Sequence, residues 1–233
     1  MIAENLKHLR ERIAAKCVEF KRNPKEIKLV AVSKFFGLDA INEANQLGIT
    51  DFGENKAQEL RDKYEILGEK VTWHFIGSLQ RNKVKYAVKA ATYIHSVDSA
   101  TLADEINIQA QKLNKVQKIL LEVKTSSEDS KSGLTTESEI LNLVKHCSTL
   151  QNVELVGLMT MAAFTDDTEI IRKSFVELRN LRDIINQNGF DLRELSMGMT
   201  NDYEIAIEEG ATMLRIGSAV FGPRDTTKDW RQS

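Results

Sequence analysis

The stretch LVAVSKFFG, residues 29–37, joins a short apolar run to a lysine, and the pattern of its first half recurs along the chain. Four apolar residues rich in β-branched side chains are typical of a strand that is buried on both faces. Lys34 follows this run after a single residue, Ser33. Because an ammonium group avoids burial unless it is paired or takes part in chemistry, Lys34 either reaches into solvent or belongs to a functional site.

Similar apolar runs occur along the whole chain, and helix-like segments separate them. These segments include residues 38–48, 99–114 and 167–189, and several end in glycine, a common helix stop. Strands that alternate with helices predict a parallel sheet, and about eight such units match the count of a (β/α)8 TIM barrel. The expected strands are residues 27–33, 49–53, 71–77, 91–97, 116–123, 153–159, 192–198 and 212–218.

An additional helix precedes the first expected strand. Its apolar residues recur at amphipathic helical spacing, and we expect Pro24 in the segment KRNPKEI to stop it. A doubly wound open sheet is the alternative, but it needs fewer strands and usually has a glycine-rich first turn, which SKFFGLD lacks. Without a linker-like tract, the prediction is a single modified TIM barrel with an extra N-terminal helix, one domain over residues 1–233.

Composition and net charge limit which partners and which location we expect for the protein. Hydrophobic residues make up 42% of the 233 residues and the formal net charge is −2, so we expect neither nucleic acid nor a membrane as a partner. Cys17 and Cys147 form no metal-binding spacing and do not suggest a disulfide framework. The charged N-terminal segment lacks the apolar stretch of a signal peptide. We therefore expect a cytoplasmic protein.

Polar residues stand where the expected barrel strands end. Active sites of TIM barrels lie at the carboxyl ends of the strands, so these residues are candidates for function. Lys131 is a further candidate, in the loop after the fifth strand. The candidates at strand ends are Lys34, Asn55, His74, His95, Ser196, Thr200, Arg215, Gly217 and Ser218.

Lys34 and two late loops together suggest one cofactor. A desolvated lysine can attack carbonyl groups at neutral pH, although a strand-end lysine can also simply reach into solvent. SMGMTND (196–202) and LRIGSAVFG (214–222) offer hydroxyl and backbone donors where TIM barrels commonly bind phosphate, although such residues also serve ordinary turns and helix caps. A Schiff-base lysine with a phosphate site suggests pyridoxal 5′-phosphate (PLP).

Several long motifs, in order along nearly the whole chain, resemble those of the pyridoxal phosphate homeostasis protein family. The motifs are AVSK, FGEN, WHFIGSLQRNK, SVDS, KSGL, GLMTM, LSMGMTND and LRIGSAVFG. The resemblance implies a TIM barrel related to that of alanine racemase, with PLP held as an aldimine on Lys34. Many relatives have a lysine or threonine and a proline soon after this lysine, where this chain has Phe35, Phe36 and Gly37.

The resemblance also implies roles for the other candidates. Ser196, Gly217 and Ser218 would hold the phosphate, with Thr200 nearby. Arg215 would face the pyridine nitrogen, and Lys131 of the KSG motif would be an auxiliary lysine. The cofactor-binding residues implied in this way are Lys34, Asn55, His74, Ser196, Thr200, Arg215, Gly217 and Ser218, and Asn55 and His74 are in motifs that line the pocket.

An arginine opposite the ring nitrogen favours cofactor binding over catalysis. A PLP enzyme that uses the ring as a strong electron sink keeps the ring nitrogen protonated, and arginine cannot accept a hydrogen bond from that N–H. We also expect no second domain that would place a tyrosine opposite Lys34. The prediction is a monomeric, non-enzymatic PLP carrier that buffers the cofactor and passes it transiently to apo forms of PLP-dependent enzymes. The alternatives are a weak amino-acid racemase or other PLP-dependent enzyme, and a Schiff-base aldolase on the same barrel.

Overall fold

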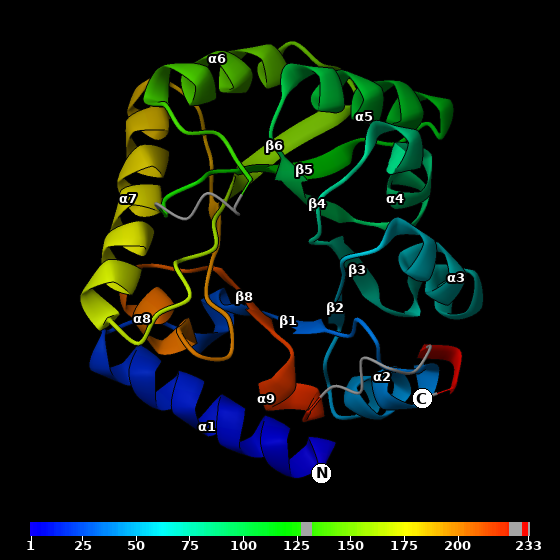
Figure 1. Cartoon of the computed structure of the whole chain (residues 1–233), viewed down its shortest axis with the longest axis vertical. Coiled ribbons are helices and arrows are strands. Elements are labelled where there is room, and N and C mark those ends of the chain that lie inside the picture. Colours follow the sequence, from blue (N-terminus) through cyan, green and yellow to red (C-terminus); the bar gives the residue numbers. More distant parts are fainter. Residues whose placement is uncertain (127–131, 224–229, 233) are drawn as a thin grey trace.

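Eight parallel strands close into a barrel in the computed structural model, which describes residues 1–126, 132–223 and 230–232 (Figure 1). The strands follow one another in sequence order, and β1 pairs with both β2 and β8. This closure confirms the barrel and excludes the open sheet. The strands are β1 (Lys28–Val32), β2 (Asp51–Glu54), β3 (Thr72–Phe75), β4 (Tyr93–Val97), β5 (Gln117–Glu122), β6 (Val153–Met159), β7 (Glu194–Ser196) and β8 (Met213–Ile216).

Helices follow the strands and form the outer layer of the barrel, as Figure 1 shows. The longest, α7, shows strong amphipathic patterning and is capped by Asp167, whose side chain accepts two backbone N–H groups of the first turn. The helices are α1 (Ile2–Glu19), α2 (Leu38–Gln46), α3 (Ala57–Leu67), α4 (Val84–Ala90), α5 (Ala100–Lys112), α6 (Glu137–Ser148), α7 (Thr168–Gln187), α8 (Tyr203–Glu208) and α9 (Ser218–Phe221), with short 3-10 helices η1 (Pro24–Glu26), η2 (Gly68–Lys70), η3 (Arg81–Lys83) and η4 (Trp230–Gln232).

Seven of the eight strands are shorter than expected, at one or both ends, whereas β6 has the expected bounds. The predicted strand 212–218 is β8 only as far as Ile216, and 192–198 is β7 only from Glu194 to Ser196. Gly217 and Ser218, which were expected in the last strand, lie beyond β8, and Ser218 begins α9. Among the other candidates, His74, His95, Ser196 and Arg215 lie within strands.

The apolar core has two parts. The larger part lies between the strands and the surrounding helices, where outward-facing strand residues such as Phe52 and Leu214 pack against helical side chains. A smaller cluster of Tyr93, Leu120, Met159 and Met213 is separate from it. The barrel is thus a packed core and not a pore.

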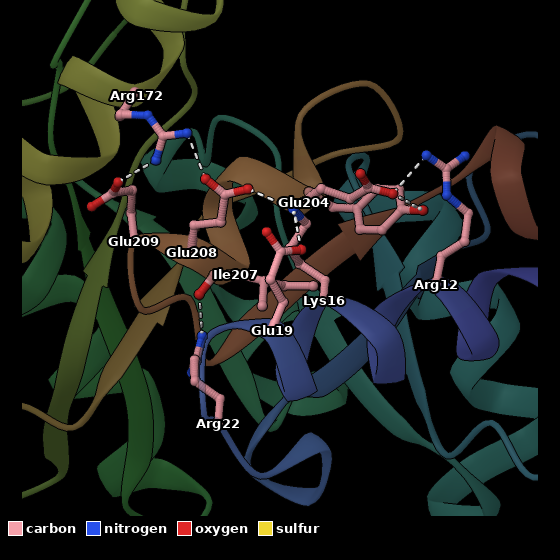
Figure 2. A network of polar contacts seen from close by, with 10 residues as sticks. Arg12, Lys16, Glu19, Arg22, Arg172, Glu204, Ile207, Glu208 and Glu209 are labelled. Carbon is pink, nitrogen blue, oxygen red and sulfur yellow. Dashed lines mark hydrogen bonds and ion pairs between the residues drawn. The ribbon is translucent and has the colours of Figure 1, made fainter.

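The N-terminal helix α1 packs against the outside of the barrel, beside α8 and α9 (Figure 1). Figure 2 shows how polar contacts join it to α8: Lys16 contacts Glu208 at 2.8 Å, and Arg172 of α7 reaches the same carboxylate. The helix ends at Glu19, before the predicted stop at Pro24, because Lys21 already has a φ of 54°. Pro24 begins η1 and does not terminate α1.

Two features are absent from the part of the chain that the structure describes. No helix there is long and apolar enough to cross a membrane. Among the same residues, no three His, Cys, Asp or Glu side chains are grouped so that they could hold a metal ion.

Candidate functional site

Lys34 lies in a four-residue turn directly after β1. The backbone N–H of Phe36 donates to the carbonyl oxygen of Ser33 at 3.0 Å, so Lys34 and Phe35 are the central residues of this turn. Phe35 has a φ of 72°, a conformation that type II turns require at their third residue. The ring of Phe36 stacks on Phe221 of α9, with centroids 4.7 Å apart. The Lys34 turn therefore packs against the segment that follows β8.

A continuous chain of hydrogen-bonded side chains crosses the inside of the barrel, and we call it the interior polar chain. Asp51 Oδ1 lies 2.9 Å from His74 Nε2, and His74 Nδ1 lies 2.9 Å from His95 Nε2. His95 Nδ1 is 2.8 Å from Ser196 Oγ, which is 2.6 Å from Arg215 Nη1. Strands β2, β3, β4, β7 and β8 each contribute one member, so the chain joins parts of the sequence that are far apart.

The two ends of the interior polar chain determine the direction of its hydrogen bonds. A guanidinium only donates, so Ser196 accepts from Arg215 and gives its own hydrogen to His95. An ionised carboxylate only accepts, so His74 donates from Nε2 to Asp51 and accepts at Nδ1 from His95. Both imidazoles are therefore neutral and carry their hydrogen on Nε2.

The pKa shifts agree with this assignment. Burial lowers the pKa of His74, and it lowers the pKa of His95 well below its usual value, with the charge of Arg215 acting in the same direction. Burial opposes ionisation of Asp51, but hydrogen bonds from His74 and Thr50 outweigh it and lower the pKa of Asp51. Asp51 and Arg215, at the two ends of the interior polar chain, are charged, and the imidazoles between them are neutral.

Arg215 is fixed by several contacts. Its second terminal nitrogen donates to the carbonyl oxygen of Thr160 at 2.8 Å, and its backbone N–H donates to Gly198. Burial lowers the pKa of Arg215 to about 10, so it remains a cation at neutral pH. The guanidinium is therefore held rigidly inside the carboxyl half of the barrel.

The loops after β7 and β8 meet through their hydroxyl groups. Ser218 Oγ donates to Thr200 Oγ1 at 3.2 Å. A Cβ atom at Gly217 would find only Val32 within 4 Å, at 3.6 Å, so the backbone there is open to close approach. Gly198 has a φ of 92° and a Cβ would lie 2.6 Å from Ala206, so this loop requires glycine at that position. The two predicted phosphate loops are neighbours in space.

The side chain of Asn55, directly after β2, contains a buried hydrogen-bond acceptor. Its Oδ1 is buried and has no hydrogen-bond partner among the described residues. Its backbone lies so close to Gly77 that a Cβ there would be 2.2 Å from the Asn55 carbonyl oxygen. Because buried amide oxygens are normally hydrogen-bonded, this atom is suited to a donor from a bound ligand.

The structure brings most of the predicted site residues to one end of the barrel. Three of them, His74, Ser196 and Arg215, belong to the interior polar chain, although His74 lies deeper, beside Asp51. The hydrogen of Ser196 Oγ is donated to His95, so the Ser196 hydroxyl has no hydrogen left to donate to a phosphate. Lys131 lies outside the described residues.

Sequence reasoning missed part of the interior polar chain. His95 was noted only as a polar residue at a strand end, and Asp51 and Thr160 were not singled out. Asp51 begins its strand, and alternation along the run 49–53 could have placed it on the inner face. Nothing in the sequence indicates that His74 and His95 hydrogen-bond to each other, because their pairing depends on the stagger between β3 and β4.

The chain is similar to several known proteins over almost its whole length. Residues 2–225 match the family model described as alanine racemase, N-terminal domain. The pyridoxal phosphate homeostasis protein of Aquifex aeolicus is 42% identical over 223 residues, which cover 95% of this chain and 97% of the relative. A protein of the same name from Schizosaccharomyces pombe is 36% identical, over 91% of this chain and 90% of its own length.

Solved structures give the same result. PipY of Synechococcus elongatus, solved with PLP bound, is 34% identical, with a TM-score of 0.83 over 95% of this chain and 100% of PipY. An alanine racemase of Clostridium difficile shares the fold, with a TM-score of 0.75 at 15% identity, over 96% of this chain and 57% of the racemase. The chain therefore belongs to the alanine racemase N-terminal domain family, and within it to the pyridoxal phosphate homeostasis proteins.

Proposed function

We propose that this protein binds PLP covalently through Lys34 and acts in PLP homeostasis, as a carrier and not as an enzyme. The observation that supports this most strongly is the position of Lys34. It lies in a rigid turn after β1, in a chain similar along its whole length to PipY, which was solved with PLP bound. PLP supplies a reactive aldehyde, which a lysine amine can hold as a Schiff base.

The residues around Lys34 fit the remaining parts of this cofactor. Gly217, Ser218 and Thr200 offer an open backbone and two hydroxyl groups for a phosphate. The guanidinium of Arg215 would face the ring nitrogen, and the unpaired Oδ1 of Asn55 would accept a hydrogen bond from the ligand. In this proposal, residues 1–233 form one PLP-binding domain.

The interior polar chain argues against strong carbanion chemistry. Arg215 cannot keep a ring nitrogen protonated, because a guanidinium only donates hydrogen bonds and cannot accept one from a ring N–H. Its neighbours His95 and His74 are neutral, and their N–H hydrogens point away from Arg215 toward Asp51. None of these groups can readily accept a proton at the mouth of the barrel. This favours storage and delivery over racemisation.

The four tyrosines also lie in places that do not favour a racemase. Tyr93 stacks on His74 and contacts Lys28, and Tyr203 donates to Glu204 beside α1. Tyr64 and Tyr86 lie on α3 and α4, in the outer helical layer. A racemase needs a proton donor on each face of the substrate carbon, and Lys34 could serve only one face.

Borohydride reduction of the PLP-loaded protein, followed by peptide mass spectrometry, tests the covalent site. We expect the wild-type adduct on Lys34, and loss of both the adduct and the visible absorbance in Lys34→Ala. The matched control is Lys89→Ala, an exposed lysine on α4, which should keep the adduct. A wild-type adduct on another lysine alone would refute the assignment.

Incubation with L-alanine in deuterated water separates a carrier from a racemase. A carrier should not exchange the Cα proton catalytically, whereas exchange that disappears in Lys34→Ala would establish the enzymatic alternative. A purified protein without visible absorbance, even after incubation with PLP, would instead favour a Schiff-base aldolase.

We further propose that the carrier is a cytoplasmic monomer that meets apo enzymes only transiently. Light scattering at increasing protein concentration should then give a constant mass near the 26.3 kDa of the chain. A stable dimer at low micromolar concentration would contradict this.

A further inference from the structure

A second buried polar group lies outside the barrel wall, directly beneath the Lys34 turn, and we call it the Lys63 cluster. Lys63 of α3 is fully buried. Its Nζ donates to Glu54 Oε1 at 2.7 Å, to Glu59 Oε1 at 2.8 Å and to the carbonyl oxygen of Ser33 at 3.0 Å. All three hydrogens of the ammonium group are therefore used, and one of the acceptors belongs to the residue that precedes Lys34.

The same cluster contacts the backbone or side chain on both sides of Lys34. Ser33 Oγ donates to Glu54 Oε1 at 2.6 Å, and the backbone N–H of Phe35 donates to Glu59 Oε1 at 3.0 Å. Phe35, with a φ of 72°, has the left-handed conformation that is costly for a bulky residue. Such a conformation persists only where neighbouring groups hold it, and the Lys63 cluster provides those contacts.

The C-terminal segment covers this cluster. Lys63 Nζ lies 5.1 Å from the centroid of the Trp230 ring, and Trp230 is only 9% exposed. Arg231 forms an ion pair with Asp62, the residue before Lys63 on α3. A cation over an aromatic face in a water-poor site is attracted more strongly than one in solvent. The last described residues therefore help to keep water from the ion pairs beneath Lys34.

We propose that Lys63 is a positioning residue for Lys34, and that Trp230 keeps the Lys63 cluster dry so that it holds the turn in one conformation. Lys63 acts on the two residues that flank Lys34: it donates to Ser33 directly, and it holds Glu59, which accepts from Phe35. The inference rests on the proposed function, in which Lys34 is the lysine that binds PLP. It adds that Lys63, a residue of the outer helical layer, controls the conformation of the turn that contains Lys34.

Hydrogen exchange in the apo protein tests the positioning without any cofactor. In Lys63→Met, the amides of residues 33–37 should exchange at least about ten-fold faster, because the acceptors that hold the turn lose their cation. The matched control is Lys115→Met, a half-buried lysine that donates to the carbonyl oxygens of Val88 and Ala91. It should leave exchange in residues 33–37 unchanged.

Equilibrium titration with PLP supplies the second measurement. Lys63→Met should weaken PLP binding about ten-fold or more while the adduct stays on Lys34, since misplacing a reacting group by even 1 Å can cost that much. Trp230→Ala should weaken it several-fold, and Trp230→Phe should restore most of the loss because it keeps an aromatic face over Lys63.

Folded Lys63→Met with wild-type exchange and wild-type PLP affinity would overturn the proposal, as would an equal loss of affinity in Lys115→Met. If Lys63→Met does not fold, the Trp230 pair decides: equal affinities for Trp230→Ala and wild type would then refute it. A wild-type adduct on a lysine other than Lys34 would refute the proposed function instead, and the exchange measurement would still test the positioning.

Discussion

The interior polar chain and the Lys63 cluster are both buried, yet they solve the problem of buried charge differently. The interior polar chain places one cation and one anion at its ends, and every hydrogen between them has an acceptor. The Lys63 cluster places one ammonium between two carboxylates, so its charges cannot all be neutralised. Within the described residues, Glu54 Oε2 has no hydrogen-bond partner.

Protonation shows the consequence of this difference. In the interior polar chain, burial keeps His74 and His95 neutral by lowering their pKa values. In the cluster, burial and the charge of Glu59 raise the pKa of Glu54 to about 7, although Lys63 opposes this. The interior polar chain is thus a rigid support with one protonation state near neutral pH. The cluster has a carboxyl group that titrates in this range, next to the backbone that positions Lys34.

Removing the cation of the Lys63 cluster should have the largest effect. Lys63→Met leaves two buried carboxyl groups without their shared partner, and we expect the free energy of unfolding to fall by about 3–5 kcal/mol. Urea denaturation measures this. Lys115→Met, which leaves two neutral carbonyl oxygens without a donor, should lose only about 1–2 kcal/mol. Equal losses would mean that the cluster is not held by charge.

The pH dependence of stability should separate the two regions by sign. Glu54 has a pKa raised from 4.5 to about 7 in the fold, so the native state keeps a proton that the unfolded state has lost between these values. Its stabilising contribution is full below pH 4.5 and disappears as the pH rises through about 7, a change of about 3 kcal/mol.

The two histidines act in the opposite direction. Their pKa values are lowered from 6.5, so their contribution is present above that pH and is lost as the pH falls below it. Urea denaturation of Glu54→Gln between pH 5 and pH 8 isolates the two effects. In this variant, the free energy of unfolding should no longer decline as the pH rises toward 7, but it should still fall on the acid side. A decline that persists unchanged in Glu54→Gln would assign it to another group.

Interrupting the interior polar chain should have a smaller effect. His95→Leu leaves His74 Nδ1 and the hydroxyl hydrogen of Ser196 without their partner, and we expect a loss of about 2 kcal/mol. His95→Gln keeps a donor and an acceptor and should recover part of it. Thermal unfolding of both variants provides the comparison, and identical melting temperatures would show that hydrogen bonding at His95 contributes little.

The network of Figure 2 is the reference for ion pairs that remain partly exposed to water. Glu208→Ala removes the contacts to Lys16 and Arg172 that join α1, α7 and α8. We expect a loss of about 1 kcal/mol, because partly exposed ion pairs are screened by water. High salt should reduce this difference, whereas the effect of Lys63→Met should persist. The exposed Glu11→Ala on α1 serves as the control for loss of a carboxylate.

Much of the fold was predictable because it depends on local patterns. The apolar runs gave the eight strands and their order, and the amphipathic spacing of residues 2–20 gave α1. Strand ends were less predictable, since β7 and β8 stop where their loops leave the ladder. Phe35 and Phe36 had no explanation in the sequence. In the structure, Phe36 stacks on Phe221, and the Phe35 ring lies 5.3 Å from Lys56 Nζ.

By itself the sequence determined the barrel, the family and the place of Lys34 at the end of a strand, because periodicity and long motifs are properties of neighbouring residues. Only the tertiary structure decided what surrounds Lys34. The interior polar chain joins residues up to 101 positions apart, and the contact of Lys63 with Ser33 spans 30. Closing the barrel brings such residues together, and burial then sets their protonation. Neither effect leaves a pattern along the chain.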